Sequence, residues 1–364
     1  MKVITLVGTR PELVKLSPVI PLLAEAFDHR LVHSGQHYSF EMDAIFFEEL
    51  RLPDPDYRLD VGTGSHAEQT ARVLQRFEPV LLKEQAGALV VLGDTNTTLA
   101  GALAAAKLHL PCIHLEAGCR SFNRQMPEEI NRIVADHVCD WLLAPGERER
   151  ANLLREGIPL ERIRVVGSTA IDACLRNSKL ARGRSTVDDL GLPAGEYVLL
   201  TLHRAENTSP DVLAGIVRAL NLLAERWHFV FPVHPRTRNV LTQLMGSDPP
   251  LQLHPHLHLI EPVGYLDMLQ LIAQARAVMT DSGGVQEETA TLGVPLLVLR
   301  EETEWMYLVE AGAAVLVGNT FDAVVETATP LLVQGKAAFR QIDVQPQRGA
   351  AERIVSMLKE LLPK

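Results

Sequence analysis

Short apolar runs alternate with longer amphipathic segments along the whole chain. In the first half, apolar runs of strand length occupy residues 2–7, 30–34, 87–93, 111–116, 140–144 and 162–167, and each is followed by a helical pattern or a turn. In the second half they occupy residues 197–202, 228–233, 257–260, 277–280, 295–299 and 314–318. Strand runs interleaved with helices are typical of parallel sheets built from βαβ units, so we predict an α/β protein rather than a β-sandwich.

A polar stretch that contains glycine separates the two halves, from about residue 177 to residue 196. Such a stretch indicates a connector with a short helix, so we predict two doubly wound, Rossmann-like domains at 1–170 and 171–349. We expect the carboxyl ends of their strands to face a cleft, where ligands of such sheets bind. The terminal segment 350–364 has the pattern of an amphipathic helix that could pack back on the first domain.

The charge and the cysteine content of the chain indicate which partners and which cellular location to expect. The net charge is −10 and the isoelectric point is about 5.7, so we expect no nucleic-acid partner and no anionic membrane surface. The four cysteines match no zinc or CxxC spacing, which is typical of free thiols in a reducing cytosol. The chain starts directly with a strand pattern and holds no apolar run of about 18 residues, so we expect a cytoplasmic protein.

The stretch "TDSGGVQEE", residues 280–288, has the pattern of an anion site. An apolar run ends there in Asp-Ser-Gly-Gly, and a helix pattern begins with Gln286, Glu287 and Glu288. Unpaired backbone N–H groups and the helix dipole favour a phosphate at such a helix start. An ordinary strand-to-helix turn, with glutamates that complement the dipole, explains the same residues. On its own, the stretch leaves both interpretations open.

Cations follow the first strand of the first domain. Arg10 and Lys15 lie in "GTRPELVK", where Thr9 and Glu12 have the spacing of a capping box. Two cations near a helix start are unfavourable to the dipole. We therefore expect them to bind an anionic ligand, rather than to form a solvated surface pair.

Three carboxylates follow strands or loops of the first domain. Asp94 comes after the run 87–93, Glu116 ends the run 111–116, and Glu128 opens a helix pattern. Alone, Asp94 could be a helix cap, and Glu128 could form an ordinary i, i+4 ion pair with Arg132. Carboxylates that gather at neighbouring strand ends push their pKa values apart, which can supply an acid and a base.

Histidines have two interpretations in the second domain. His203 and Arg204 directly follow the run 197–202, and this pair suits contact with a phosphate or a leaving group better than a purely structural role. Further histidines lie at His234, His254, His256 and His258. No carboxylate follows the last three at ligand spacing. We expect no metal site.

Signatures of common cofactors are missing from the sequence. "GTRPE" lacks the second glycine that lets a backbone approach a dinucleotide pyrophosphate, and no Walker A, GxSxG or HExxH pattern occurs. Nicotinamide, ATP-hydrolysis and serine-esterase chemistry are therefore disfavoured, and we expect no cofactor.

Read in order, "GTRPELVK", "GDTNTTLAG", "HLEAGCRSFNRQMPEEINR", "GSTAIDA", "LTLHRAEN", "PVHP" and "TDSGGVQEE" resemble the motifs of the non-hydrolysing UDP-N-acetylglucosamine 2-epimerases. The resemblance runs from residue 1 to about residue 318. It implies the two-domain fold of the GT-B glycosyltransferases, a homodimer, and a UDP-sugar substrate for cell-surface polysaccharide precursors. It also implies C2 epimerisation without a cofactor, by anti elimination of UDP to a glycal and re-addition.

The resemblance assigns roles position by position. Asp94, Glu116 and Glu128 match the acid/base carboxylates, although the sequence does not say which of them takes the C2 proton. The positions that match contacts of the diphosphate are Arg10, His203, Ser282, Gly283 and Gly284. Glu288 matches the position that holds the ribose hydroxyls, and Lys15 and Arg132 match further active-site positions.

Two departures from the family pattern bear on specificity. Trp305 stands where an arginine is common, which looks more like branches that act on modified sugars such as UDP-2,3-diacetamido-2,3-dideoxyglucuronate. "GQHYSFEMD" keeps Gln36 and His37 of an activating second site but continues with Tyr38 and Ser39, so we expect weak or absent substrate activation. A retaining GT-B glycosyltransferase, a hydrolysing epimerase and a non-enzymatic nucleotide-sugar sensor are the rival functions.

Overall fold

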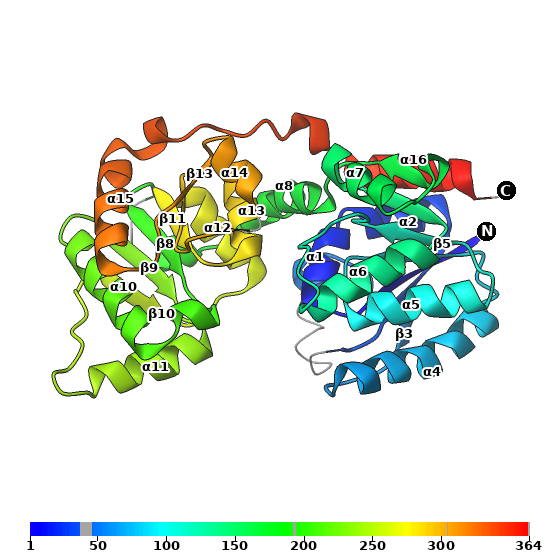
Figure 1. The fold of residues 1–364 in the computed structure, drawn as a ribbon, viewed down its shortest axis with the longest axis horizontal. Coiled ribbons are helices and arrows are strands. Elements are labelled where there is room, and N and C mark those ends of the chain that lie inside the picture. The colour runs from blue at the N-terminus through cyan, green and yellow to red at the C-terminus, as the bar shows by residue number, and fades with distance from the viewer. Residues whose placement is uncertain (37–45, 192–193, 304, 363–364) are drawn as a thin grey trace. The chain divides into compact units, whose positions relative to one another are not determined.

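The structure is a computed structural model that describes residues 1–36, 46–191, 194–303 and 305–362. It divides into two compact units, which Figure 1 shows. Unit 1 contains residues 1–173 and 345–364, and unit 2 contains residues 174–344. The chain passes from unit 1 to unit 2 within helix α8 (Thr169–Ala181). Residues 37–39, which motivate the expectation of weak or absent substrate activation, lie outside the described residues.

Unit 1 is built on a parallel sheet with the strand order β3-β2-β1-β4-β5-β6-β7. Its strands are β1 (Lys2–Val7), β2 (Asp28–His33), β3 (Tyr57–Arg58), β4 (Ala88–Leu92), β5 (Cys112–Leu115), β6 (Trp141–Ala144) and β7 (Ile163–Val165). Each apolar run of the first half forms a strand, as predicted. Strand β3 was not predicted, because its two half-buried residues form no apolar run.

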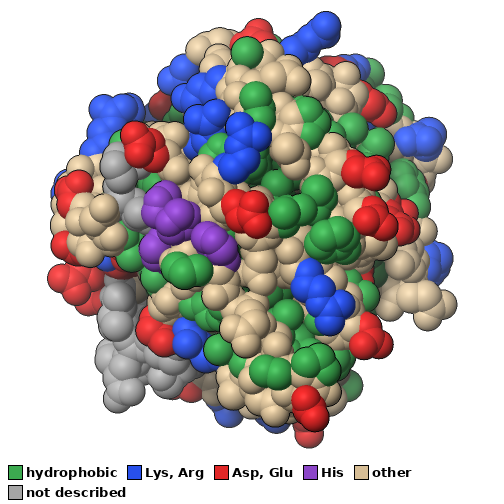
Figure 2. Space-filling model, turned by 90° about the vertical axis from the view of Figure 1, so that its left-hand side faces the viewer, with side chains coloured by type: hydrophobic (Ala, Val, Ile, Leu, Met, Phe, Trp, Pro, Cys, Tyr) green, Lys and Arg blue, Asp and Glu red, His purple; other side chains and the backbone are tan. Residues whose placement is uncertain are grey.

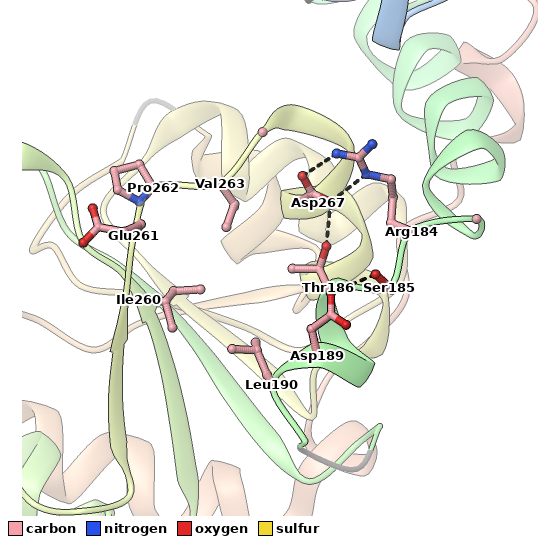
Figure 3. A pocket seen from close by; sticks show the side chains of 12 residues that line it. Arg184, Ser185, Thr186, Asp189, Leu190, Ile260, Glu261, Pro262, Val263 and Asp267 are labelled. Atoms are coloured by element: carbon pink, nitrogen blue, oxygen red, sulfur yellow. Dashed lines mark hydrogen bonds and ion pairs between the residues drawn. The ribbon is translucent and has the colours of Figure 1, made fainter.

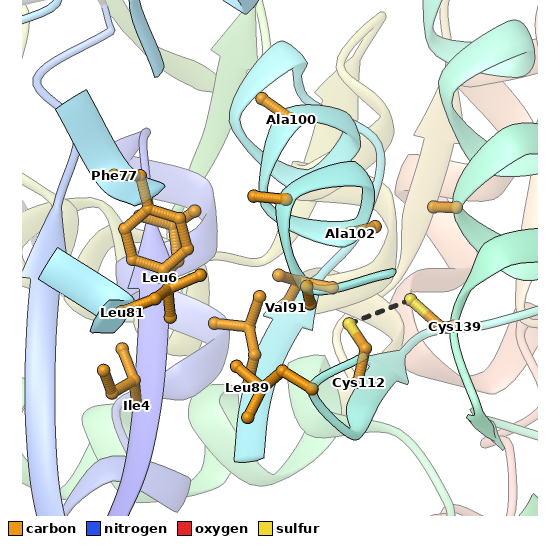
Figure 4. Close-up of a cluster of buried hydrophobic side chains, with 14 of the residues drawn as sticks. Ile4, Leu6, Phe77, Leu81, Leu89, Val91, Ala100, Ala102, Cys112 and Cys139 are labelled. Atoms are coloured by element: carbon orange, nitrogen blue, oxygen red, sulfur yellow. Dashed lines mark hydrogen bonds between the residues drawn. The ribbon is translucent and has the colours of Figure 1, made fainter. Parts of the chain in front are cut away.

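Helices cover the sheet of unit 1. They are α1 (Arg10–Leu16), α2 (Val19–Ala26), α4 (His66–Glu84), α5 (Asn96–Lys107), α6 (Pro127–Val138), α7 (Glu147–Arg155) and the C-terminal α16 (Ala350–Leu361), which packs on α2. Figure 4 shows part of the core, where Phe77 and Leu81 of α4 meet Leu6 and Leu89 of the sheet. Helix α5 is rich in alanine and approaches the sheet closely. A Cβ at Gly101 would come within 2.7 Å of Leu6 Cδ2, so glycine permits this approach.

Unit 2 repeats the architecture with a parallel sheet in the order β10-β9-β8-β11-β12-β13. Its strands are β8 (Tyr197–Thr201), β9 (His228–Pro232), β10 (Leu257–Ile260), β11 (Ala277–Thr280), β12 (Leu296–Val298) and β13 (Ala314–Leu316). Its helices are α9 (Thr186–Asp189), α10 (Pro210–Leu223), α11 (Pro235–Met245), α12 (Tyr265–Gln274), α13 (Gly283–Thr291), α14 (Met306–Glu310) and α15 (Phe321–Gln334). The predicted pair of parallel α/β sheets is confirmed.

The strand order locates the edge of each sheet where a ligand fits. In unit 1 the order reverses at β1, which lies between β2 and β4, and in unit 2 it reverses at β8, which lies between β9 and β11. Doubly wound sheets bind ligands outside the carboxyl ends of the strands at such a reversal. A ligand site is therefore expected at the turns after β1, β4 and β5 in unit 1, and at those after β8 and β11 in unit 2. Among the helices of the described residues, none is long and apolar enough to cross a membrane.

Candidate active site

The turns after β1 and β4 of unit 1 share one buried carboxylate, that of Glu12. One of its oxygens accepts hydrogen bonds from the backbone N–H groups of Gly8 (2.8 Å) and Thr9 (2.7 Å), which completes the predicted capping box. The other oxygen accepts from the hydroxyls of Thr95 (2.9 Å) and Thr98 (3.1 Å) at the start of α5. Burial raises the pKa of Glu12, against the lowering effect of these hydrogen bonds. Glu12 therefore links the turn that carries Arg10 to the turn that carries Asp94.

Lys15 and Glu116 form an ion pair in unit 1. Lys15 Nζ on α1 lies 2.7 Å from Glu116 Oε2, just after β5, and the Thr169 hydroxyl donates to Glu116 Oε1 at 3.2 Å. Glu116 has a φ of +62°, a left-handed conformation that a side chain other than glycine rarely adopts. Backbone strain of this kind is concentrated at functional sites. The cation predicted at Lys15 thus meets the acid predicted at Glu116.

A second ion pair joins Asp94 to Arg132. Arg132 Nη2 lies 2.5 Å from Asp94 Oδ2, and Arg132 Nη1 lies 2.9 Å from Glu129 Oε2. Arg132 therefore pairs with Asp94 and Glu129, rather than forming the i, i+4 pair with Glu128 that the sequence allowed. Glu128 is half-buried in the first turn of α6. Arg10, the remaining cation predicted in unit 1, lies at the start of α1, and its guanidinium is 4.6 Å from the centre of the Phe46 ring.

Sequence reasoning missed the role of Glu129. Its buried carboxylate accepts hydrogen bonds from the backbone N–H of Ser121 (2.9 Å), the Ser121 hydroxyl (3.0 Å) and the backbone N–H of Phe122 (3.0 Å). Burial acts to raise its pKa, but these hydrogen bonds and Arg132 hold the pKa below the usual value. Glu129 is thus an ionised anchor for the loop between β5 and α6. The pair of adjacent acids in "PEEINR" was a possible signal, but it does not say which acid turns inward.

In unit 2 a buried aspartate, Asp281, organises the turns after β8 and β11. It accepts hydrogen bonds from the backbone N–H groups of His203 (3.1 Å) and Arg204 (3.0 Å) and from Asn207 Nδ2 (3.1 Å). His203 Nδ1 also lies 3.0 Å from its carboxylate. Burial acts to raise the pKa of Asp281, but these partners hold it below the usual value. Asp281 was not among the predicted residues, although it follows a buried strand as Asp94 does.

The start of α13 presents the predicted anion site. Ser282 is its N-cap residue, and the Ser282 N–H donates to the Thr280 hydroxyl at 2.9 Å. A Cβ at Gly283 would lie 3.1 Å from Trp305 Nε1 and 3.9 Å from Arg204 Nη2, whereas a Cβ at Gly284 would lie in open space. Close packing therefore explains Gly283 but not Gly284. The N–H groups of this first helical turn, with the indole and guanidinium beside them, form a group of donors.

Glu288 lies one turn further along α13. Burial, and to a lesser degree the charge of Glu287, raises the pKa of Glu288 to about 8, and the hydroxyl of Tyr265 hydrogen-bonds to it. Glu288 is therefore mostly protonated at neutral pH. The hydrogen bond to Tyr265 connects α13 to the start of α12.

Two other features of unit 2 lie apart from these turns. A cavity of about 650 Å³ lies between the connector and the end of β10. Figure 3 shows its lining, in which Arg184 and Asp267 form an ion pair at 2.7 Å. None of the predicted site residues lines it. Figure 2 shows histidine side chains gathered on one face. The rings of His228 and His258 lie 5.3 Å apart. Within the described residues, no group of three or more histidines, cysteines or acids has an arrangement that could hold a metal ion.

The predicted residues thus lie in two groups, one in each unit, in the turns after the strands and in the helices that follow. Unit 1 holds Arg10, Lys15, Asp94, Glu116, Glu128 and Arg132, and unit 2 holds His203, Ser282, Gly283, Gly284 and Glu288. Paired carboxylates and cations in unit 1 can move protons, and the donors in unit 2 can bind a phosphate.

Several known proteins that resemble the chain are 2-epimerases of UDP-sugars. Residues 23–359 match the family described as UDP-N-acetylglucosamine 2-epimerase. The UDP-N-acetylglucosamine 2-epimerase of Methanocaldococcus jannaschii is 44% identical over 98% of this chain and 99% of its own. The UDP-2,3-diacetamido-2,3-dideoxy-D-glucuronate 2-epimerase of Pseudomonas aeruginosa is 43% identical over 99% of this chain and 100% of its own. The crystal structure of the M. jannaschii enzyme with UDP-GlcNAc and UDP has a TM-score of 0.82 and 43% identity, over 99% of this chain and 100% of that chain.

Proposed function

The chain belongs to the UDP-N-acetylglucosamine 2-epimerase family, and on that premise we propose that it inverts C2 of a UDP-2-acetamido sugar. The proposed reaction converts UDP-GlcNAc to UDP-ManNAc reversibly, which makes the protein an isomerase. The observation that carries the proposal is the pair of ion pairs at one edge of the unit 1 sheet, Lys15 with Glu116 and Arg132 with Asp94.

The chemistry of the sugar requires such a site. The proton on C2 of a 2-acetamido sugar is not acidic enough for simple removal and return. In the proposed path a carboxylate takes this proton, the bond from C1 to the diphosphate oxygen breaks, and UDP leaves with the electron pair. A proton then adds to the other face of C2 of the glycal, and UDP bonds to C1 again. We assign Asp94, Glu116 and Glu128 jointly as the acid/base groups, with Lys15 and Arg132 as their cationic partners.

The leaving group, UDP, must stay bound to the protein while it is detached from the sugar. We assign the diphosphate to Ser282, Gly283 and Gly284 at the start of α13, with His203 and Arg10 as further contacts. Preorganised donors stabilise the charge that develops on a departing oxygen, and the loss of one such donor typically costs about 10²-fold or more in rate. We assign Glu288 to the ribose hydroxyls, which can hydrogen-bond to its carboxyl oxygens.

Proton NMR in deuterium oxide tests the reaction. We expect incubation of the protein with UDP-GlcNAc to give UDP-ManNAc with deuterium at C2, because the removed proton exchanges with solvent on the enzyme. Epimerisation without deuterium at C2 would contradict the elimination path. Stoichiometric release of free sugar and UDP would instead show a hydrolysing enzyme, and a requirement for an acceptor would show a glycosyltransferase.

The modified sugar UDP-2,3-diacetamido-2,3-dideoxyglucuronate is a second candidate substrate. The 43% identity to the P. aeruginosa 2-epimerase of that sugar favours it, as does Trp305 beside the start of α13. The same NMR experiment with this substrate decides between the two sugars by the ratio of kcat/KM values. A ratio above about 10 in either direction would assign the physiological sugar class.

Assembly and location complete the proposal. We propose that the protein is a homodimer in the cytosol, as the family resemblance and the free thiols suggest. Light scattering coupled to size-exclusion chromatography gives the mass in solution. A mass of one chain at micromolar concentration would contradict the dimer.

A further inference from the structure

A chain of buried charged groups lies directly behind the turns that carry Asp94 and Glu116. His114 is on β5 and Asp136 is on α6, and their side chains are 1% and 0% exposed. His114 Nδ1 lies 2.7 Å from Asp136 Oδ1, and Arg120 Nη2 lies 2.7 Å from Asp136 Oδ2. Arg120 also donates two hydrogen bonds to Glu156 at the end of α7, at 2.8 and 2.7 Å. These buried groups do not belong to the proposed substrate contacts.

The protonation state of His114 defines its hydrogen bonds. Burial acts to lower its pKa, but the adjacent Asp136 carboxylate outweighs burial and raises the pKa to about 9. The ring is therefore an imidazolium at neutral pH, and both of its nitrogens are donors. Nδ1 donates to Asp136, and Nε2 donates to the backbone carbonyl of Gly93 at 2.8 Å.

Each member of the pair hydrogen-bonds to the backbone of a turn that carries a proposed catalytic residue. Gly93, whose carbonyl accepts from His114, directly precedes Asp94. Gly118, whose N–H donates to Asp136 Oδ2 at 3.1 Å, follows Glu116 by two residues. Each turn bends through left-handed residues, with φ of +77° at Gly93, +62° at Glu116 and +81° at Gly118. Such turns keep their shape when tertiary contacts hold them.

We propose that the buried pair His114–Asp136 positions Asp94 and Glu116 relative to each other for proton transfer. The pair joins the Gly93 carbonyl to the Gly118 N–H through two side chains, so it sets the separation of the two turns. His114 and Asp136 are positioning residues, because they touch neither the sugar nor the reacting atoms. The inference rests on the proposed function and adds residues to it. The alternative is a pair that stabilises unit 1 without affecting catalysis.

Two isosteric substitutions of His114 separate these roles. The amide nitrogen of glutamine can reach the place of Nε2, so His114→Gln keeps a donor for the Gly93 carbonyl and loses the bond to Asp136. The amide nitrogen of asparagine can reach the place of Nδ1, so His114→Asn keeps a donor for Asp136 and loses the bond to Gly93. A positioning role predicts that both variants lose turnover, because each breaks the connection from Gly93 to Gly118, whereas a purely stabilising role predicts that turnover is kept.

The test measures kcat, KM and UDP affinity with UDP-GlcNAc, and Tm by calorimetry, for the wild type and both variants. We expect both variants to lose about 10- to 100-fold in kcat and to bind UDP within about twofold of the wild type. We expect Tm to fall more for His114→Gln, which loses the bond to the buried Asp136 carboxylate, so the loss of kcat should not follow the loss of Tm. His29→Gln is the matched control, because His29 hydrogen-bonds Thr5 at 2.9 Å on another strand, away from these turns.

The outcomes distinguish this inference from the proposed function. Wild-type kcat in either His114 variant, or a kcat loss that follows the fall in Tm, would overturn the positioning role while leaving the epimerase proposal intact. A wild-type protein that epimerises neither UDP-sugar would overturn both. Asp136→Asn provides a second measurement. It keeps an acceptor for Gly118 but neutralises the carboxylate, and a kcat loss with unchanged UDP affinity supports the inference, whereas unchanged kcat contradicts it.

Discussion

In unit 1 the proposed carboxylates are partly exposed, whereas the carboxylate at the equivalent edge of unit 2 is enclosed. The side chains of Asp94 and Glu116 are 30% and 14% exposed, and each pairs with one cation. The side chain of Asp281 is 0% exposed, and its oxygens accept from the turn after β8. Both units place an acid after a parallel strand, but the unit 1 acids are open to solvent, whereas Asp281 is not. This difference agrees with the proposed roles, in which unit 1 supplies the acid/base groups and unit 2 holds the nucleotide.

The largest expected effect comes from removing the acids of unit 1. Asp94→Asn and Glu116→Gln should each lower kcat by about 10²- to 10⁴-fold, because an amide cannot transfer the proton. UDP affinity should stay within a few-fold, since the diphosphate contacts are assigned mainly to unit 2. Rate measurements test the loss of kcat, and calorimetric titration with UDP tests the retained affinity. Near-normal rates in both variants would show that the site is assigned to the wrong residues.

A weaker effect on rate, with a clear effect on binding and stability, is expected for Asp281→Asn. The new amide group would face the N–H donors of His203 and Arg204, and an unsatisfied buried group costs about 1–3 kcal/mol. The turn should then loosen, and UDP affinity should fall by about tenfold. Asp322→Asn, at the exposed start of α15, is the matched control. Full UDP affinity in Asp281→Asn would refute the view that unit 2 holds the nucleotide through this turn.

A smaller difference is expected between two neighbouring glycines of unit 2. A Cβ at Gly283 would lie only 3.1 Å from Trp305 Nε1, so Gly283→Ala should displace the indole and weaken UDP binding by about fivefold to tenfold. Gly284→Ala places its Cβ in open space and should have less effect. Isothermal titration of both variants with UDP measures the difference. Equal losses would mean that contact with the ligand, not packing against Trp305, determines both positions.

The smallest expected effect on function is a pH dependence of stability that differs between the units. Glu288 in unit 2 has a pKa raised from 4.5 to about 8, and His114 in unit 1 has a pKa raised from 6.5 to about 9. A raised pKa gives stability that is complete below the unfolded-state pKa and is lost as pH rises through the folded-state pKa. Stability should therefore fall from about pH 4.5 to 8 through Glu288, and from about pH 6.5 to 9 through His114.

Chemical denaturation across pH 4 to 10 measures this dependence. Glu288→Gln should flatten the fall between about pH 4.5 and 8, and His114→Gln should flatten it between about pH 6.5 and 9. A wild-type curve that rises with pH over these ranges would contradict the raised pKa values.

Strand positions were predictable because a buried parallel strand needs a continuous apolar run. Each predicted run forms a strand, and the predicted cations and acids lie in the turns after those strands or in the helices that follow. The partners of these residues were less predictable. The sequence suggested an ion pair of Glu128 with Arg132. In the structure the Arg132 guanidinium pairs with Glu129 and Asp94 instead. Successive residues of a helix point about 100° apart, so the packing of α6 against α5 determines which of the two acids turns inward.

By itself, the sequence determined two parallel α/β sheets, the turns to which the chemistry is assigned and the family to which the chain belongs. These features depend on local patterns: the period of apolar residues, glycine and proline at turns, and short ordered motifs. Only the tertiary structure decided which charges are paired and which are enclosed. His114, Asp136 and Asp281 look like ordinary polar residues in the sequence, because their burial and partners come from strands and helices far apart along the chain. A charge acquires its pKa and its role from those neighbours, and the fold alone brings them together.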